Sequence, residues 1–335
     1  MDRRVTNIAE VGSVHDGSFG NALKLIELAA ECGADSVKFQ THIAEAETLK
    51  DAPMPSFFKG EPRYEYFERT GFSLNQWKEL KAQCNEQKIE FLSSPFSIEA
   101  VELLEQVGIK RYKVPSGEIT NLPLLKVIAE TRKPVLLSSG MSTWQELDDG
   151  VNTIQKVHND ITILQCTSEY PCSYDNVGLD VMLEMKERYQ LRVGLSDHTL
   201  TNYSAFTAVA MGASVIEKHL TFSRNMYGSD AKHSLKPKEF CDLVTGVRAI
   251  EAIVSSKVDK DEIAKQMCEM KDVFQKSIVS IRNIPKGTII TEKMIGFKKP
   301  GTGIPVSNVE SVLGMCAKKD IVIDRLISME DLENA

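Results

Sequence analysis

The sequence has no apolar run long enough to cross a membrane, and its start, MDRRVTNIAEVG, lacks the apolar core of a secretory signal. Its 7 cysteines are odd in number and irregularly spaced, which disfavours a disulfide framework and favours a reducing compartment. It has no run of Lys or Arg, and its net charge is −7, so we expect neither nucleic acid nor a membrane as a partner. We expect a soluble cytoplasmic protein whose cysteines lie mostly in the core and do not serve as nucleophiles.

What the sequence does contain is a repeated alternation, from Thr6 to about Ser256, of short apolar runs and helix-length amphipathic segments. Among the helical segments, 21–33 ends on Gly33 as a C-cap and 121–132 begins on Asn121 as an N-cap. Strand–helix units of this number and total length are typical of a (β/α)₈ barrel, about 250 residues long. A doubly wound open sheet is the alternative, but the first turn here is not glycine-rich. The expected strands are 7–12, 36–41, 90–95, 111–117, 134–140, 161–168, 192–198 and 215–221.

The alternation of short apolar runs and helix-length segments stops near residue 256. A charged stretch, 257–276, is expected to be part helix and part linker. Residues 277–335 contain short apolar runs separated by turns at 285–287 and 301–303, which predicts a small β-rich domain. We therefore predict a barrel domain over residues 1–256, a linker over 257–276 and a second domain over 277–335.

Several expected strands carry charged residues where a barrel strand would be apolar. Because side chains alternate along a strand, Lys38 and Gln40 face the barrel axis, as does Glu10. Glu217 and His219 share a face in the same way. A buried charge without a partner costs several kcal/mol, so polar groups converging on the carboxyl ends of the strands indicate an active site there. For any single glutamate, a salt bridge is an equally good explanation.

His198 and His219 end the two neighbouring strands 192–198 and 215–221. Adjacent strands lie about 4.8 Å apart, so the two imidazoles are able to bind one divalent metal and leave other coordination positions open. The alternative is a pair of barrel histidines satisfied by hydrogen bonds. His15, His42 and His158 are expected to be surface or loop residues.

Two lysines are expected at the same carboxyl end of the barrel. Lys38 and Lys113, surrounded by hydroxyl groups, form a cationic site suited to a phosphate or carboxylate. Taken one at a time, a serine that ends a strand is more often the N-cap of the next helix. The serines concerned are Ser94, Ser116, Ser138 and Ser196.

These residues lie in motifs that resemble those of the sialic acid synthase family, N-acetylneuraminate synthase-like enzymes with a C-terminal antifreeze-like domain. The motifs are IAEVGSVHDGS (8–18), VKFQTH (37–42), FLSSPFS (91–97), YKVPSGEITNLPLL (112–125), LLSSGMST (136–143), QCTSEYP (165–171), GLSDHTL (194–200), GASVIEKHLT (212–221) and KKPGTGI (298–304). The resemblance implies a (β/α)₈ TIM barrel followed by a small antifreeze-like (SAF) domain, in a domain-swapped homodimer. It also implies condensation of phosphoenolpyruvate with an N-acetylmannosamine-type sugar to a nine-carbon 2-keto acid.

The resemblance carries roles to matching positions. His198 and His219 match metal ligands, for Mn²⁺ or Mg²⁺. The positions matching phosphoenolpyruvate contacts are Lys38, Ser94, Lys113, Ser116, Ser138, Ser168 and Ser196. The positions matching sugar contacts are Glu10, Gln40, Tyr170, Asp230 and Lys299. Glu118 is the first candidate to carry protons and Glu217 the second. Asp197, on the opposite parity, is expected to bond neighbouring backbone.

The sequence departs from the family pattern at two places. Lys299 stands where Arg commonly precedes Pro-Gly-x-Gly and reaches from the partner's small domain to the acyl group of the sugar; lysine keeps the charge and loses the planar fork. Residues 14–16 are Val-His-Asp where Asn-His-Asn/Glu is usual.

Three other functions compete with this interpretation. In the first alternative, the enzyme is a legionaminic or pseudaminic acid synthase that acts on a dideoxy diacetamido hexose, and the chemistry in the barrel is unchanged. A related barrel enzyme using a phosphorylated aldose would want a second basic cluster, which the sequence lacks. A non-catalytic glycan-binding protein would have no need to keep Lys38, Lys113, His198 and His219 together.

Overall fold

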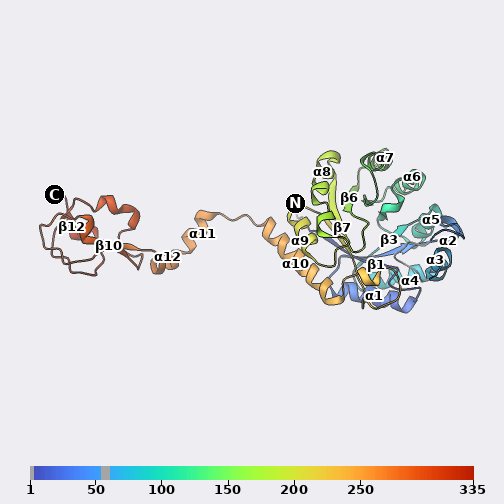
Figure 1. Ribbon diagram of the computed structural model, residues 1–335, viewed down its shortest axis with the longest axis horizontal. Helices are drawn as coiled ribbons and strands as arrows, with labels where there is room; N and C mark the ends of the chain where they lie inside the picture. Colours follow the sequence, from blue (N-terminus) through green and yellow to red (C-terminus); the bar gives the residue numbers. More distant parts are fainter. Residues whose placement is uncertain (1–3, 54–60) are drawn as a thin grey trace. The chain divides into compact units, whose positions relative to one another are not determined.

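The computed structural model describes residues 4–53 and 61–335. The chain divides into two compact units, Met1–Ser255 and Ser256–Ala335, which are described separately (Figure 1). In the described part, no helix combines the length and apolar character needed to span a membrane.

The first unit is a nearly closed barrel of parallel strands. The strands run in the order β3-β2-β1-β8-β7-β6-β5-β4, and β3 packs beside β4 to bring the two edges together. This confirms the predicted fold class, with the strands ending a few residues earlier than expected at β4, β5, β6 and β8. Their bounds are β1 Thr6–Gly12, β2 Ser36–Thr41, β3 Glu90–Pro95, β4 Tyr112–Val114, β5 Val135–Ser138, β6 Ile161–Cys166, β7 Arg192–Asp197 and β8 Val215–His219.

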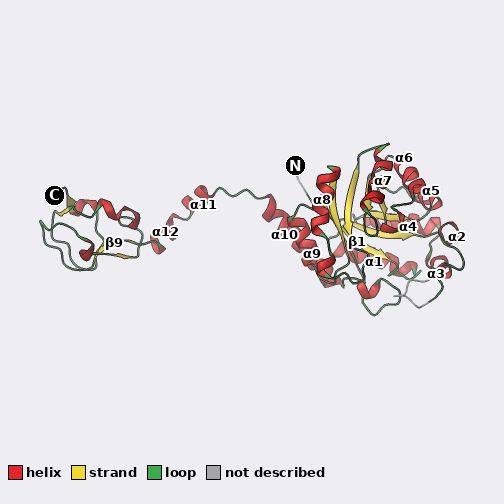
Figure 2. Ribbon diagram, turned by 45° about the horizontal axis from the view of Figure 1, so that its top comes forward, coloured by secondary structure: helices red, strands yellow, loops and turns green. Residues whose placement is uncertain are grey.

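Helices cover the outside of the strands (Figure 2). Ser18 caps the first of them by accepting a hydrogen bond from Asn21 N at 3.2 Å, and Gly33 follows its end with φ +79°, a conformation that favours glycine. Asn121 caps a later one as predicted, accepting from Leu124 N at 3.3 Å. The helices are α1 Phe19–Glu31, α2 Ala44–Glu47, α3 Arg63–Thr70, α4 Leu74–Glu86, α5 Ile98–Val107, α6 Leu122–Glu130, α7 Trp144–Gln155, α8 Leu179–Tyr189, α9 Tyr203–Ala210 and α10 Pro237–Ser255.

Inside the barrel, an apolar layer separates two polar layers. The apolar layer is a cluster of Ile8, Leu92, Leu136, Leu164 and Val215. Two residues further toward the carboxyl ends of β1, β3, β5 and β8, the inward side chains are polar, as the alternation predicted. The outward side chains at intervening positions pack into the large core between strands and helices.

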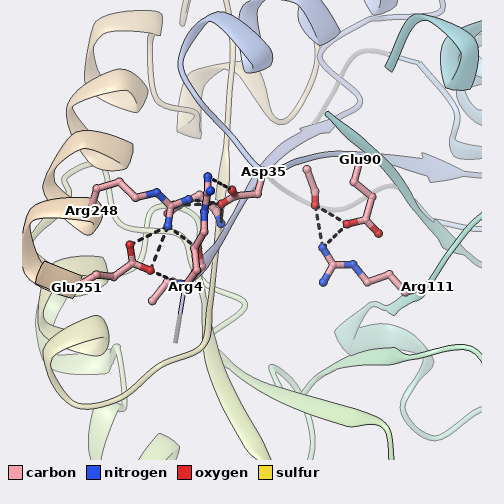
Figure 3. Close-up of polar contacts among 9 residues, drawn as sticks. Arg4, Asp35, Glu90, Arg111, Arg248 and Glu251 are labelled. Atoms are coloured by element: carbon pink, nitrogen blue, oxygen red, sulfur yellow. Dashed lines mark hydrogen bonds and ion pairs between the residues drawn. The ribbon is translucent and has the colours of Figure 1, made fainter. Parts of the chain in front are cut away.

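The amino ends of the strands form the other polar layer (Figure 3). Arg111 Nη2 donates to Glu90 Oε2 at 2.7 Å and to Ser36 Oγ at 2.8 Å. Beside it, Asp35 accepts from Arg4 at 2.8 Å and from Arg248 of α10 at 2.5 Å. These pairs tie the last barrel helix to the first strands.

The outward residue Asp197 is buried and paired. Its Oδ1 accepts from Thr199 N at 2.8 Å, which confirms the expected backbone bond. Its Oδ2 also accepts from Lys218 Nζ at 2.7 Å, and Lys218 donates further to the carbonyls of Thr199 and Thr201. The pair fixes the loop that follows β7.

The second unit is small and rich in short strands, as predicted. Two helices, α11 Lys260–Gln266 and α12 Cys268–Phe274, occupy most of the stretch expected as a linker. Two antiparallel two-stranded sheets follow, around a core that includes Ile278, Ile284, Ile290, Val312 and Ile327. The strands are β9 Ser277–Ser280, β10 Ile295–Lys298, β11 Cys316–Ala317 and β12 Leu332–Glu333.

His15 and His42 lie in loops, as expected, but neither is a surface residue. His15 is only 3% exposed, accepts from Gly17 N at 3.1 Å and packs on the Phe72 ring with centroids 4.8 Å apart. His42 is stacked between two aromatic rings beside the cavity described below. Of the cysteines, Cys268 is exposed and the rest are buried or half-buried.

Candidate active site

A cavity of about 380 Å³ lies at the carboxyl ends of the barrel strands. It brings together thirteen of the sixteen residues predicted for the site: Glu10, Lys38, Gln40, Lys113, Ser116, Ser138, Ser168, Tyr170, Ser196, His198, Glu217, His219 and Asp230. Ser94, Glu118 and Lys299 are not in its lining within the described ranges. Ser94 lies just beneath the floor, fully buried, and accepts from Lys38 Nζ at 3.3 Å.

Four buried charges form the floor. Lys38 Nζ lies 2.9 Å from Glu10 Oε2 and 3.8 Å from Glu217 Oε1, and Lys113 Nζ lies 3.5 Å from Glu217 Oε1. All four side chains are at most 6% exposed. Such a cluster is held together by mutual attraction in a low-dielectric setting.

The pKa values follow from this arrangement. Burial alone would raise the pKa of Glu217, but Lys113 and Lys38 lower it to about 2. Burial raises the pKa of Glu10 despite its contact with Lys38. Without a ligand, Glu217 therefore pairs with both lysines, and Lys38 also pairs with Glu10.

The serine hydroxyl groups form hydrogen bonds with the floor and walls of the cavity and do not cap the helices that follow the strands. Lys113 Nζ donates to Ser138 Oγ at 2.7 Å, and Ser196 Oγ donates to Glu217 Oε1 at 3.0 Å. Ser116 Oγ accepts from Gly140 N at 3.0 Å. The N-cap alternative is wrong for the serines that end β3, β5 and β7, because the caps of α5, α7 and α9 are Ser97, Thr143 and Asn202.

The two histidines lie side by side, with ring centroids 5.7 Å apart. His198 Nδ1 is 2.8 Å from the Thr167 carbonyl and donates to it, which directs Nε2 away from that bond. His219 Nδ1 is buried and has no hydrogen-bond partner among the described residues. Burial lowers the pKa of His219 to about 4, so its ring is neutral at physiological pH.

This donor set of two neighbouring imidazoles fits a divalent metal. No cluster of three or more His, Cys, Asp or Glu groups with metal-binding geometry is found in residues 4–53 and 61–335. The alternative, two histidines fully satisfied by hydrogen bonds, does not describe His219.

Asp230 and Tyr170 stand over the histidines. Asp230 Oδ2 accepts from Ser13 N and Ser13 Oγ, both at 2.8 Å. A side chain at Gly12 would put a Cβ 2.4 Å from Asp230 Oδ2, and Gly12 has φ +52°, so only glycine suits this close approach. The Tyr170 ring lies 4.1 Å from the His198 ring, centroid to centroid.

Glu118, the first candidate for proton transfer, is placed at the rim. It belongs to the 3₁₀ turn Ser116–Glu118 and accepts from Asn121 Nδ2 at 2.8 Å. Burial raises the pKa of its carboxyl group. Ser116 and Gly117 of the same turn line the cavity, whereas the acidic side chains in the lining are those of Glu10, Glu217 and Asp230.

Several lining residues escaped the sequence analysis: Ser13, His42, Arg63, Tyr66, Phe67, Phe96, Met141, Cys166, Ser229 and His233. His42 and Cys166 continue the inward alternation of β2 and β6, so strand parity contained a signal for both. Arg63, Tyr66 and Phe67 come from α3, for which the strand pattern offers none.

Cys166 is a cysteine that lines the cavity. Its Sγ lies 3.5 Å from Ser116 Oγ inside the cavity. Burial would raise the pKa of its thiol, but His198 and Ser116 lower it to about 7.

Lys299 lies in the second unit, with Nζ 5.0 Å from the centre of the Phe274 ring.

Comparison with known proteins agrees with both units. The NeuB family model matches residues 25–259, and the SAF domain model matches residues 275–333. The chain is 39% identical to N,N'-diacetyllegionaminic acid synthase of Campylobacter jejuni, over 96% of this chain and 98% of that protein. It is 32% identical to human N-acetylneuraminate-9-phosphate synthase, over 98% of this chain and 92% of that protein.

Among solved structures, the chain resembles N-acetylneuraminic acid (sialic acid) synthetase from Leptospira borgpetersenii in complex with citrate. The TM-score is 0.70 with 29% identity, covering 81% of this chain and 92% of that one. Together with the barrel, the small second domain and the cavity, these matches establish the family. The chain belongs to the NeuB family and is a phosphoenolpyruvate-dependent condensing enzyme of the sialic acid synthase type.

Proposed function

We propose that this enzyme joins phosphoenolpyruvate to the open-chain form of an N-acetylated mannosamine-type sugar, giving a nine-carbon 2-keto acid and phosphate. The observation that carries the proposal is the pairing of two buried lysines with two neighbouring histidines in one cavity. A cationic clamp and a Lewis-acid site are the two requirements of this reaction.

Lys38 and Lys113 bind the phosphate and carboxylate of phosphoenolpyruvate, with hydroxyl donors from Ser116, Ser138 and Ser196. Ser94 acts from below by holding Lys38. Ser168 completes the wall on the β6 side. An anionic substrate replaces Glu217 as the partner of the lysines, which frees that carboxylate for another role.

His198 and His219 would hold a divalent metal, Mn²⁺ or Mg²⁺, which supplies a Lewis acid for the aldehyde oxygen of the sugar. The Thr167 carbonyl keeps His198 in the tautomer that leaves Nε2 available. The low pKa of His219 keeps its ring neutral, as a metal ligand must be.

The bond changes are two additions and one elimination. C3 of phosphoenolpyruvate attacks the aldehyde carbon, and the aldehyde oxygen takes up a proton to become a hydroxyl group. Water adds at C2, and the resulting tetrahedral intermediate loses phosphate. Glu217 takes up the proton from water, since it becomes more basic once the lysines pair with substrate. Glu118 at the rim is the second candidate, with a raised pKa that suits proton exchange with solvent.

The sugar lies over the histidines, against Glu10, Gln40, Tyr170 and Asp230. Within this class we favour a dideoxy diacetamido hexose. Proteins named N,N'-diacetyllegionaminic acid synthase are 39% and 33% identical to this chain. N-acetylmannosamine itself is the other candidate.

The direct test incubates the purified protein with phosphoenolpyruvate, Mn²⁺ and a panel of N-acyl hexosamines that includes both sugars. Phosphate release and 2-keto acid formation are followed together. We expect both products in equal amounts, with the diacetamido sugar turned over fastest. Phosphate release that does not depend on any sugar, or no release at all, would contradict the proposal.

We also propose that the active enzyme is a domain-swapped homodimer in which Lys299 reaches the sugar in the partner's barrel. Lys299→Ala should raise the sugar KM about tenfold, the effect of removing one charged group that touches substrate. Mixed with inactive His219→Ala, it should regain activity, because one heterodimer site is fully wild-type. No recovery after subunit exchange, verified by mass spectrometry, would exclude the shared site.

A further inference from the structure

A chain of hydrogen bonds runs from α2 into the cavity. Glu47 Oε1 lies 2.6 Å from His42 Nδ1, and His42 Nε2 lies 3.2 Å from Gln40 Oε1. Gln40 Nε2 then donates to Glu10 Oε1 at 2.8 Å. Gln40 and Glu10 both line the cavity, whereas Glu47 is buried behind His42 with its side chain 6% exposed.

The chain fixes the direction of each group. Glu10 is a carboxylate, so the Gln40 group facing it is the NH₂, and the Gln40 carbonyl must face His42. His42 therefore carries a hydrogen on Nε2. At Nδ1, one proton lies between the ring and Glu47, and either location leaves the Nε2–H bond to Gln40 in place.

The His42 ring is also held in place by stacking. The Phe67 ring lies 3.8 Å from it at 6° between planes, and the Phe96 ring lies 4.0 Å from it at 22°. Phe67 comes from α3 and Phe96 follows β3. An imidazole held on both faces and at both nitrogens has no freedom to rotate, which is how a positioning group for substrate is built.

We propose that His42 is a positioning residue that presents the Gln40 amide to the sugar, with Glu47 and the two phenylalanine rings holding His42 in register. The inference rests on the proposed function, in which Gln40 faces the sugar. Without the Nε2 donor, the Gln40 amide loses one of its two hydrogen bonds and is held only by Glu10, so its position against the sugar is less well fixed.

The test removes the polar pair without leaving a buried charge. His42→Phe combined with Glu47→Leu keeps a stacked ring and similar volumes, whereas His42→Gln keeps a donor near the position of Nε2. The double variant should raise the sugar KM about tenfold and leave the phosphoenolpyruvate KM within about twofold. His42→Gln should restore most of the loss, and the control His158→Phe should change neither constant.

A second measurement separates positioning from a structural role. In a Gln40→Ala background, the same double variant should have almost no further effect on the sugar KM, because His42 acts through Gln40. A full tenfold loss in that background, or equal losses for both substrates, would overturn the inference.

Nitrogen-15 spectra of the histidine rings test the geometry without turnover. The wild-type His42 signal should show a protonated Nε2, and Gln40→Ala should shift it. A wild-type His42 without a hydrogen on Nε2 would overturn the inference even in an active enzyme. If the wild-type protein turns over no sugar, the proposed function fails, and these spectra still decide whether His42 holds Gln40.

Discussion

The barrel contains charged residues at both ends, and the two ends treat them differently. At the amino ends of the strands, Arg111 and Glu90 form a direct pair and are 17% and 24% exposed (Figure 3). At the carboxyl ends, Lys113 and Glu217 are 3% and 6% exposed and their closest atoms lie 3.5 Å apart. The better-formed ion pair is thus the more exposed one.

The comparison separates structural charges from functional ones. A pair that only closes the barrel can stay close and partly hydrated, where it costs little desolvation. Burying Lys113 deeply and leaving it loosely paired with Glu217 costs stability, and the arrangement is explained when an anionic ligand completes it. The Glu217 Oε2 atom, buried with no hydrogen-bond partner in the described part of the chain, belongs to the same incomplete layer.

The largest effect should come from the histidines of the carboxyl end. His219→Ala should lower kcat more than about a thousandfold, because a Lewis acid contributes several kcal/mol to such a reaction. Calorimetry should show the loss of one tight Mn²⁺ site. The matched change at the other end, Asp35→Asn, should leave Mn²⁺ binding unaltered. Unchanged Mn²⁺ affinity in His219→Ala would refute the assignment.

The second effect sets the two ion pairs against each other. Lys113→Met should lower kcat/KM for phosphoenolpyruvate about a hundredfold or more, because it removes a charged group from a desolvated binding site. Arg111→Met should leave kcat/KM within about twofold and lower the free energy of unfolding by about 1–3 kcal/mol, because Glu90 and Ser36 lose their partner. Steady-state kinetics and urea unfolding measure both. Equal kinetic losses in the two variants would abolish the distinction between the ends.

Much of the arrangement at the carboxyl end of the barrel could be predicted from the sequence. Alternation along β1, β2 and β8 was enough to turn Glu10, Lys38 and Glu217 inward, since a strand has only two faces. Alternation also turns His42 inward, but its contacts with Phe67 and Glu47 depend on the path of the chain through α3 and α2. His15 is a loop histidine, as predicted, but its burial could not be predicted because it depends on tertiary neighbours such as Phe72. Glu118 follows a strand, but a 3₁₀ turn, invisible in the periodicity, keeps it at the rim.

The smallest effect is a difference in acid sensitivity. Burial lowers the pKa of both His15 and His219 to about 4, and both lie at the carboxyl end. In the unfolded chain each histidine takes up a proton near its ordinary pKa of about 6.5, whereas in the folded protein it stays neutral down to about pH 4. The free energy of unfolding therefore falls as pH drops from about 6.5 to about 4. Arginine stays charged throughout this range, so the arginine partners at the amino end are not lost there. Hydrogen exchange in EDTA should therefore show the carboxyl end loosening first.

His15→Asn isolates one of these contributions. Asparagine keeps an acceptor near the place of Nδ1 but does not gain a proton, so the variant should lose less stability than wild type between pH 7 and pH 5, by about 2 kcal/mol. Urea unfolding at the two pH values gives the difference directly, and catalytic constants at pH 7 serve as the control for an intact site. The sign matters more than the size: if His15→Asn were the more acid-sensitive protein, His15 would be charged in the folded state. Its ring would then be stabilised by Asp230, and this attraction would outweigh the desolvation caused by its burial against Phe72.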